Sequence, residues 1–332
     1  MSRSSAIQIS VVVPVRNEEK SVRTLIEGLI DQTWPPNEIV ITDGGSTDST
    51  REIIEECISN GAPVTLIRET ASLPGRARNI GARHCRNDWI AFTDAGNKLG
   101  PSWLATLAER VCNDETIDVV YGGYEPVVDT FFTECAAIAY VSPKAPTPDG
   151  LVRPRSIASA LMRKQVWDEV GGFPEQLRSA EDLLFMNKIE AADFRVVRAP
   201  AALVRWYIQP TMWKTFRRFV VYARNNMRAG LWRDWQAAVF RRCGLVALTA
   251  VPAIFLGVKW LSIPLFLWAA LMLARALKAL YLNRQTYPAG WLRNMLRVLL
   301  LVPIISVLDL AALTGTISWL LLDRLRLSRN PG

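Results

Sequence analysis

The chain has 332 residues, half of them apolar, with a formal net charge of +8 and one histidine. This length allows one large domain with an appendage, or two ordinary domains. One histidine excludes a metal centre built from several histidines, and the basic residues form no DNA- or RNA-reading motif, so we expect no nucleic-acid partner. Five cysteines without paired spacing indicate packing roles in a reducing compartment.

The apolar residues are unevenly distributed along the chain. Residues 1–240 alternate apolar and charged stretches as a soluble α/β protein does, whereas 243–322 consists mostly of Leu, Ala, Val, Ile and Trp. This pattern predicts a soluble domain tethered to a membrane. The first apolar run, Ile9 to Val15, is short and contains a proline, so we interpret it as a buried strand and expect no cleavable signal peptide.

Residues 1–125 predict alternating strands and helices. Strand-type runs lie at 9–13, 38–42, 64–68, 89–93 and 118–122, and helix-type stretches lie near 18–31, 47–59, 74–86 and 101–113. Such alternation predicts a doubly wound, mostly parallel α/β sheet. The periodicity fails from Glu125 to Pro154, where prolines gather; we expect a mobile connection over the site, with an ordinary surface loop as the alternative.

Three polar segments follow apolar β-runs, at the edge where an open parallel sheet binds a nucleotide. They are Ile9-Ser-Val-Val-Val-Pro-Val-Arg-Asn-Glu18, Asp43-Gly-Gly-Ser-Thr-Asp48 and Phe92-Thr-Asp-Ala-Gly-Asn97. Together they resemble the family-two glycosyltransferases, the inverting group with a Rossmann-like GT-A domain, and the resemblance extends with gaps from about residue 7 to about residue 230. It implies a nucleoside-diphosphate sugar as the donor.

The resemblance also implies which residues bind that donor. The matching positions are Pro14, Arg16, Glu18, Asp43, Arg78, Asp94 and Ala95. Asp43 would accept a hydrogen bond from the base or ribose, although capping a turn with Ser46 is the alternative role. Arg78 precedes Asn79 as in the family's Arg-Asn pair, and we expect it to contact the diphosphate.

The metal motif of the family is incomplete in this chain. Asp94 occupies the first position of the Asp-x-Asp motif, but Gly96 occupies the last, and Gly44 stands where many relatives have a second aspartate. We expect Mg²⁺ or Mn²⁺ bound through Asp94, water and diphosphate oxygens, because magnesium commonly keeps several waters. The departures leave open a degenerate transferase.

A second motif supplies the catalytic candidates. Val170-Gly-Gly-Phe-Pro174 precedes Glu181-Asp182, which resembles the acceptor half of the family. Inverting transfer needs a base that takes the proton of the acceptor hydroxyl, and Asp182 matches that base, with Glu181 orienting it. The alternative is a pair of carboxylates favoured by the dipole at a helix start.

The region 211–242 predicts basic amphipathic helices at a membrane interface. Trp213, Phe216, Val220, Ala223 and Met227 recur at helical spacing. The intervening arginines indicate snorkelling toward head groups. Either Arg217 or Arg218 is a candidate for contact with the acceptor or the diphosphate, and a purely lipid-facing role is the alternative.

The C-terminal part predicts membrane helices over 243–323 and a basic tail over 324–332. Runs at 243–258 and 260–274 are too short for straight spans and indicate a tight hairpin or two short spans. Val298–Leu322 is long enough to cross, and its Asp309 should face protein or lumen rather than lipid. Flanking basic residues predict cytoplasmic loops and C-terminus, with four crossings or a re-entrant pair around Asp309.

The chain is therefore predicted to comprise a transferase domain over 1–210 followed by interfacial and membrane segments. The expected activity is transfer of a sugar from a nucleoside diphosphate to a hydroxyl of a lipid-linked or saccharide acceptor, at the inner membrane and on its cytoplasmic side. A polyprenyl-phosphate glycosyltransferase is the first alternative. A catalytically inactive, sugar-nucleotide-binding membrane partner is the second.

Overall fold

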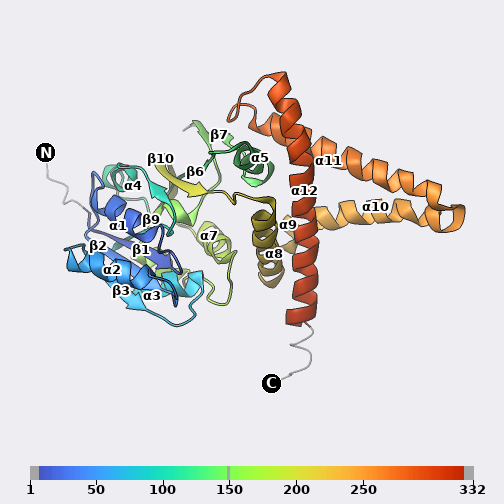
Figure 1. Ribbon diagram of the computed structural model, residues 1–332. Coiled ribbons are helices and arrows are strands. Elements are labelled where there is room, and N and C mark those ends of the chain that lie inside the picture. The colour runs from blue at the N-terminus through green and yellow to red at the C-terminus, as the bar shows by residue number, and fades with distance from the viewer. Residues whose placement is uncertain (1–6, 148–149, 325–332) are drawn as a thin grey trace. The chain divides into compact units, whose positions relative to one another are not determined.

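The computed structural model describes residues 7–147 and 150–324 (Figure 1). The chain forms two compact units. The first runs to Val127 and resumes over Ala145–Tyr207, and the second combines Val128–Lys144 with the chain from Ile208 onward. The first unit contains the sheet, and the secondary-structure elements described in the second are all helices and helical turns.

The first unit is built on an eight-stranded, mostly parallel sheet with the order β3-β2-β1-β4-β9-β6-β10-β5. Strands β9 and β5 run antiparallel to their neighbours, and all other pairs are parallel. The strands are β1 (Ile9–Val15), β2 (Glu38–Asp43), β3 (Val64–Arg68), β4 (Trp89–Phe92), β5 (Lys98–Leu99), β6 (Val119–Val127), β9 (Ala160–Arg163) and β10 (Val196–Tyr207). The predicted α/β class is confirmed.

The expected helices of the first half are also present, because each buries one apolar face. In α1, for example, Val22, Leu25, Ile26 and Leu29 are buried at helical spacing. The helices of this unit are α1 (Val22–Ile30), α2 (Thr50–Ser59), α3 (Pro74–His84), α4 (Trp103–Asn113), α6 (Lys164–Glu169) and α7 (Glu181–Ala191), with a 3₁₀ turn at Ile157–Ser159.

The stretch from Glu125 to Pro154 is more regular than expected. It contains α5 (Phe131–Tyr140) and a short hairpin of β7 (Ala145–Thr147) and β8 (Gly150–Val152). Thr130 and Thr133 form a capping box at the start of α5. The expectation of an irregular connection is therefore wrong for α5, whose run of small and apolar residues shows little contrast between its faces.

The second unit contains the apolar C-terminal helices. They are α8 (Met212–Arg228), α9 (Trp232–Trp235), α10 (Ala237–Leu256), a 3₁₀ turn (Val258–Leu261), α11 (Ser262–Asn283), and α12 (Trp291–Trp319), which continues into a π turn at Leu320–Arg324. Helices α10 and α11 form the predicted tight hairpin, with Gly257 at φ +96° between them (Figure 1). By length and composition, Val258–Asn283 and Trp291–Arg324 could each cross a membrane.

Two expectations for this unit need correction. Helix α12 is continuous through Asp309, so the described residues form no re-entrant pair there, and α10, α11 and α12 do not make four crossings. The continuous helix tolerates Asp309 because this residue is 8% exposed and paired with arginines, in agreement with the expectation that it faces protein.

The arginines of α8 that we expected to snorkel toward head groups include two that are paired within the protein. Arg224 and Arg228 both bind Asp323.

Close packing of α3 on β1 fixes the position of the residues that α3 carries. A Cβ on Gly81 of α3 would lie 2.6 Å from Val12 Cγ1, whereas a Cβ on Gly28 of α1 would meet nothing within 4 Å. Alanine usually stabilises a helix interior relative to glycine by about 0.5–1 kcal/mol.

We therefore predict opposite effects for the same substitution on two helices. Gly28→Ala should raise the free energy of unfolding by about 0.5–1 kcal/mol, and Gly81→Ala should lower it by about 1–3 kcal/mol because of overpacking. Urea unfolding of both variants measures the difference. An equal gain in both would contradict the close packing of α3 on β1.

Candidate functional site

The loops after β1 and β2 are joined by hydrogen bonds. Because β2, β1 and β4 are neighbouring parallel strands, their carboxyl ends lie at one edge of the sheet. The Asn17 amide donates to Ser46 Oγ at 2.9 Å, and Asn17 Oδ1 accepts from the Thr47 amide at 2.9 Å. Asn17 is left-handed at φ 56°. Such backbone outliers cluster at binding sites, so this loop is a candidate ligand cradle.

The three predicted binding residues of the first loop differ in burial and in their contacts. Pro14 is half-buried near the end of β1 and pairs in register with Thr42, whereas Arg16 is exposed. Glu18 is half-buried, and its Oε2 accepts from Ser21 Oγ at 2.5 Å. Burial raises the pKa of Glu18, with Asp48 and Asp94 adding to the rise.

Asp43, at the end of β2, is fully buried and organises the second loop. Its Oδ1 accepts from Ser46 Oγ at 2.5 Å and its Oδ2 pairs with Arg51 Nε at 2.7 Å. The alternative role of turn cap is thus present in the structure. A contact between Asp43 and a nucleoside stays a prediction.

The two glycines that depart from the family pattern have different surroundings. A Cβ on Gly44 would lie 2.8 Å from the Ser72 carbonyl oxygen, so the loop after β3 leaves no room for an aspartate there. A Cβ on Gly96 would meet only Glu18 Oε2, at 3.6 Å. Gly96 therefore leaves space beside Glu18, whereas the close backbone at Gly44 leaves no space for a side chain.

Asp94 has 36% of its side chain exposed, and Ala95 beside it is half-buried. Its Oδ1 accepts from Arg78, which leaves Oδ2 for another partner. No group of three or more metal-ligating side chains is assembled among the residues that the structure describes. The donors present fit a cation held by one or two carboxylates, waters and diphosphate oxygens.

Arg78 of α3 joins Asp94 to the carboxylates of α7. Its Nη2 donates to Asp94 Oδ1 at 2.6 Å, its Nη1 donates to Glu181 Oε1 at 2.8 Å, and 5% of its side chain is exposed. Burial alone would lower the pKa of Arg78, but Asp94, Glu181 and Asp182 raise it. Both terminal nitrogens thus bind the protein's own carboxylates, and contact with a diphosphate stays a prediction.

Asn79 fixes the loop that leads to α7. Its Oδ1 accepts from the Phe173 amide at 2.8 Å and from Trp167 Nε1 at 3.1 Å, and its Nδ2 donates to the Phe173 carbonyl at 2.9 Å. Phe173 also stacks on Phe185 of α7 with centroids 3.9 Å apart. This network positions the start of α7 relative to α3.

The two catalytic candidates lie at the start of α7. Ala180 before them is left-handed at φ 71°, and Asp182 Oδ1 accepts from the Leu183 amide at 2.8 Å. Burial raises the pKa of both Glu181 and Asp182, while Arg78 opposes the rise. Glu181 Oε2 is buried without a hydrogen-bond partner in the described structure. A carboxylate with a raised pKa is suited to accept a proton from a hydroxyl.

The structure also places residues that sequence reasoning weighed differently or missed. The sequence analysis did not identify Arg51 as a partner of Asp43. The one signal that could have indicated it is its position on the helix after the second loop, three residues beyond Asp48. The single histidine, His84, lies at the end of α3, where its Nδ1 hydrogen-bonds the Ile80 carbonyl at 2.8 Å. Arg217 and Arg218 belong to α8 of the second unit, where Arg217 is exposed and Arg218 donates to Tyr222 Oη.

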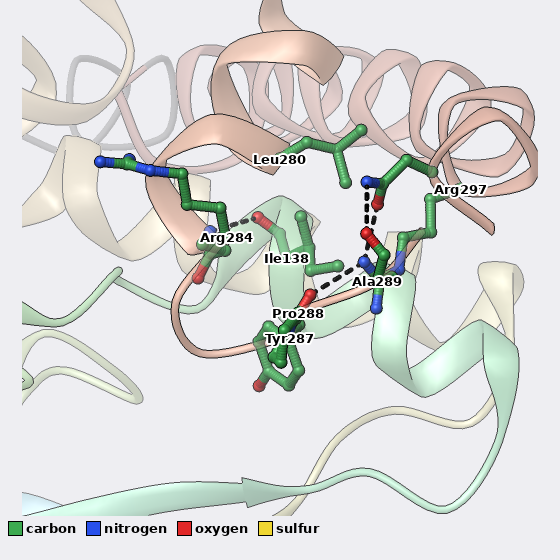
Figure 2. Close-up of a pocket in the computed structure, with 9 residues that line it drawn as sticks. Ile138, Leu280, Arg284, Tyr287, Pro288, Ala289 and Arg297 are labelled. Atoms are coloured by element: carbon green, nitrogen blue, oxygen red, sulfur yellow. Dashed lines mark hydrogen bonds between the residues drawn. The ribbon is translucent and has the colours of Figure 1, made fainter. Parts of the chain in front are cut away.

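The second unit has a cavity of about 300 Å³ near the turn between α11 and α12 (Figure 2). Its lining includes Arg284 and Arg297 but none of the predicted site residues. Arg297 donates to Glu134, to the Tyr287 carbonyl and to Asn294, so its guanidinium is fully engaged. The cavity is therefore not the candidate catalytic site.

Comparison with known proteins shows similarity in sequence and in fold. Residues 10–171 match the family described as Glycosyl transferase family 2. The chain is 33% identical over 112 residues to the uncharacterized glycosyltransferase YibD of Escherichia coli K12, covering 34% of this chain and 33% of YibD. The chain thus spans about a third of the length of that curated relative.

Two further similarities cover more of the chain. It is 25% identical over 272 residues to the succinoglycan biosynthesis protein ExoA of Rhizobium meliloti, covering 78% of this chain and 82% of ExoA. Its fold is similar to that of the mannosyltransferase PcManGT from Pyrobaculum calidifontis, solved in complex with GDP-Man and Mn²⁺. That likeness has a TM-score of 0.57 at 17% identity and covers 96% of this chain and 88% of the other, and it concerns the fold alone.

Two arginines on one helix provide a matched test of the buried ion pairs. Arg78→Gln leaves Glu181 buried without its partner, so we predict a loss of about 3–5 kcal/mol in the free energy of unfolding. Arg76 is 51% exposed, and Arg76→Gln should change that free energy by less than about 1 kcal/mol. Urea unfolding measures both. Equal losses would show that Arg78 has no special structural role.

Proposed function

Since the chain belongs to glycosyl transferase family 2, we propose that it is an inverting, membrane-attached enzyme that transfers a sugar from a nucleoside diphosphate to an acceptor hydroxyl. The observation that carries this proposal is that Arg78 forms ion pairs with both Asp94 and Glu181. It links a loop of the nucleotide-binding edge to the helix that carries Asp182, so donor and base are held by one network.

Asp182 is the proposed general base. Its carboxylate takes the proton of the acceptor hydroxyl, the resulting oxygen attacks the anomeric carbon, and the bond from that carbon to the diphosphate oxygen breaks. The nucleoside diphosphate leaves with the electron pair, and the proton stays on Asp182 until solvent removes it. Glu181 orients this group while Arg78 holds Glu181 in place.

The nucleotide-sugar site is proposed at the first two loops and Asp94. Pro14, Arg16 and Glu18 with Asp43 would line the nucleoside pocket, and Ala95 would lie beside the diphosphate. Arg51 supports this arrangement because it donates both to Asp43 and to the Ser46 carbonyl, and so holds the second loop in shape. Arg217 and Arg218 remain the proposed acceptor or diphosphate contacts from the second unit.

A divalent cation, Mg²⁺ or Mn²⁺, is the proposed cofactor. When bound, it would neutralise charge on the diphosphate. Asp94 is the first proposed ligand, and Glu18 is the second because its Oε2 borders the space that Gly96 leaves open. Glu18 would thus supply the carboxylate that the incomplete motif lacks.

The acceptor is proposed to be a lipid-linked saccharide at the inner membrane, with the catalytic domain in the cytoplasm. One observation supports attachment to a membrane. Helices α10 and α11 expose large apolar side chains along their length, among them Leu248, Phe255, Leu265 and Phe266, each more than 60% exposed. Such surfaces are rare on soluble monomers.

The base assignment is tested by an Asp182→Asn variant. We predict that turnover falls at least about 100-fold while nucleotide affinity stays nearly unchanged, because the lost carboxylate acts on the acceptor and not on the donor. Asp193→Asn, an exposed position beyond the C-terminal end of α7, is the matched control and should keep full turnover. Nucleotide sugars would first be screened by thermal shift, and turnover followed by nucleotide release. Unchanged turnover in Asp182→Asn would remove the assignment.

The metal proposal is tested by direct Mn²⁺ binding. With nucleoside diphosphate present, Glu18→Gln should weaken Mn²⁺ binding about tenfold or more, whereas the exposed neighbour change Glu19→Gln should alter it little. Gly96→Asp should strengthen binding, because aspartate tolerates the left-handed backbone at φ +81° better than most residues. Electron paramagnetic resonance of free Mn²⁺ gives the affinities. Equal values for the two glutamate variants would exclude Glu18 as a ligand.

A further inference from the structure

A buried charge cluster joins the three apolar helices of the second unit. Asp309 of α12 accepts from Arg242 Nη2 of α10 at 2.9 Å and from Arg275 Nη1 of α11 at 2.6 Å. Asp309 is 8% exposed, so the carboxylate faces protein. Each of the three helices therefore contributes one charge to this cluster.

The cluster has more positive than negative charge. One carboxylate meets two guanidinium groups, and the described part of the chain offers no acceptor to Arg242 Nη1 or to Arg275 Nε and Nη2. The two arginine side chains are 23% and 30% exposed, so part of each side chain is accessible from outside. Arg241 and Lys278, both exposed, add positive charge within a turn of the pair.

The position of the cluster along the hairpin indicates which anion it meets. From Arg242 to the turn at Gly257, and back from Ser262 to Arg275, each arm is about 20 Å long at 1.5 Å per residue. The arms expose apolar side chains, and the turn carries Lys259 and Trp260. In a bilayer the arginine pair would then lie where the hydrocarbon ends and lipid phosphates begin.

We infer that Arg242 and Arg275, held by Asp309, bind the phosphate of a membrane lipid. Guanidinium groups donate paired hydrogen bonds to phosphate oxygens, and an excess cation beside hydrocarbon requires a counter-ion. The phosphate could belong to a bulk anionic phospholipid or to a polyprenyl diphosphate. This inference goes beyond the proposed transfer reaction and does not require it.

The cavity of Figure 2 is a weaker candidate for the same ligand. Its Arg297 is occupied by Glu134 and neighbouring acceptors. Its Arg284 lies 4.0 Å over the Tyr281 ring and donates to the Tyr281 carbonyl. Of these two candidates, the Arg242 and Arg275 pair is the one that combines partly exposed arginines with unbalanced charge on exposed apolar helices.

The test uses the full chain in a neutral detergent, with bound lipid counted by native mass spectrometry. The probes are phosphatidylglycerol, a polyprenyl diphosphate and, as the phosphate-free control, diacylglycerol. We expect both phosphate lipids to bind and diacylglycerol not to bind. The phosphate lipid with the lower Kd identifies the source of the phosphate. Equal binding of diacylglycerol would overturn the inference.

Variants separate a phosphate site from a purely structural latch. Arg275→Gln leaves a neutral pair of Arg242 and Asp309 and should weaken phosphate-lipid binding about tenfold, while Arg241→Gln removes the same charge nearby and should weaken it less than about threefold. Asp309→Asn makes the cluster more positive, so binding should be kept or strengthened.

Two outcomes would contradict the site: equal losses in Arg275→Gln and Arg241→Gln, or a loss in Asp309→Asn as large as in Arg275→Gln. If Arg275→Gln does not fold, Arg275→Lys keeps the charge, loses the paired donors, and should still weaken binding more than Arg241→Gln. The Asp182→Asn variant should bind lipid as the unsubstituted chain does. The lipid-binding result therefore does not depend on whether the transferase proposal is correct.

Discussion

The ion pairs of Arg78 are the constraint on which the site depends. A guanidinium that is 95% buried is costly unless acceptors bind it; here Asp94 and Glu181 accept from its two terminal nitrogens, while its Nε is buried without a hydrogen-bond partner in the described structure. Because the guanidinium fork is rigid, it fixes the distance between these segments. The loop after β4 and the start of α7 are therefore held together by charge as well as by packing.

The packing around Arg78 serves the same arrangement. Gly75 at the start of α3 approaches the Pro174 carbonyl so closely that a Cβ would lie 2.2 Å from it, and Gly81 lies against Val12 of β1. Asn79 binds the loop before α7 through both ends of its amide. A single helix thus contacts strand β1 on one side and the loop before α7 on another.

Much of the first half was predictable because its signals are local. Apolar runs such as Ile39 to Ile41 are buried strands, and helices such as α1 repeat their apolar residues at helical spacing. The antiparallel β9 was not predictable from its four residues, since a short apolar run does not distinguish strand from helix. In β10, a bulge between Ala199 and Leu203 interrupts the alternation that would have indicated a strand.

Sequence motifs indicated candidate residues for the site but not the interactions among them. Motif positions indicated Asp43, Arg78, Asp94 and Asp182, but the pairing of Arg78 with Glu181 joins residues 103 positions apart, and no local pattern contains it. Likewise, Gly44 and Gly96 look equivalent as departures from a motif. Their surroundings differ because Ser72 approaches only the first, and tertiary contacts of this kind are absent from the sequence pattern.

The most direct test of the central claim is the pH dependence of kcat/KM in variants of Arg78. Arg78 lowers the pKa of Glu181 and Asp182 against the effect of burial, so its removal should raise the pKa of the base, and the base acts only when deprotonated. We expect Arg78→Gln to move the acid limb to higher pH, and Arg78→Lys to move it less. An acid limb that stays in place in both variants would contradict the account.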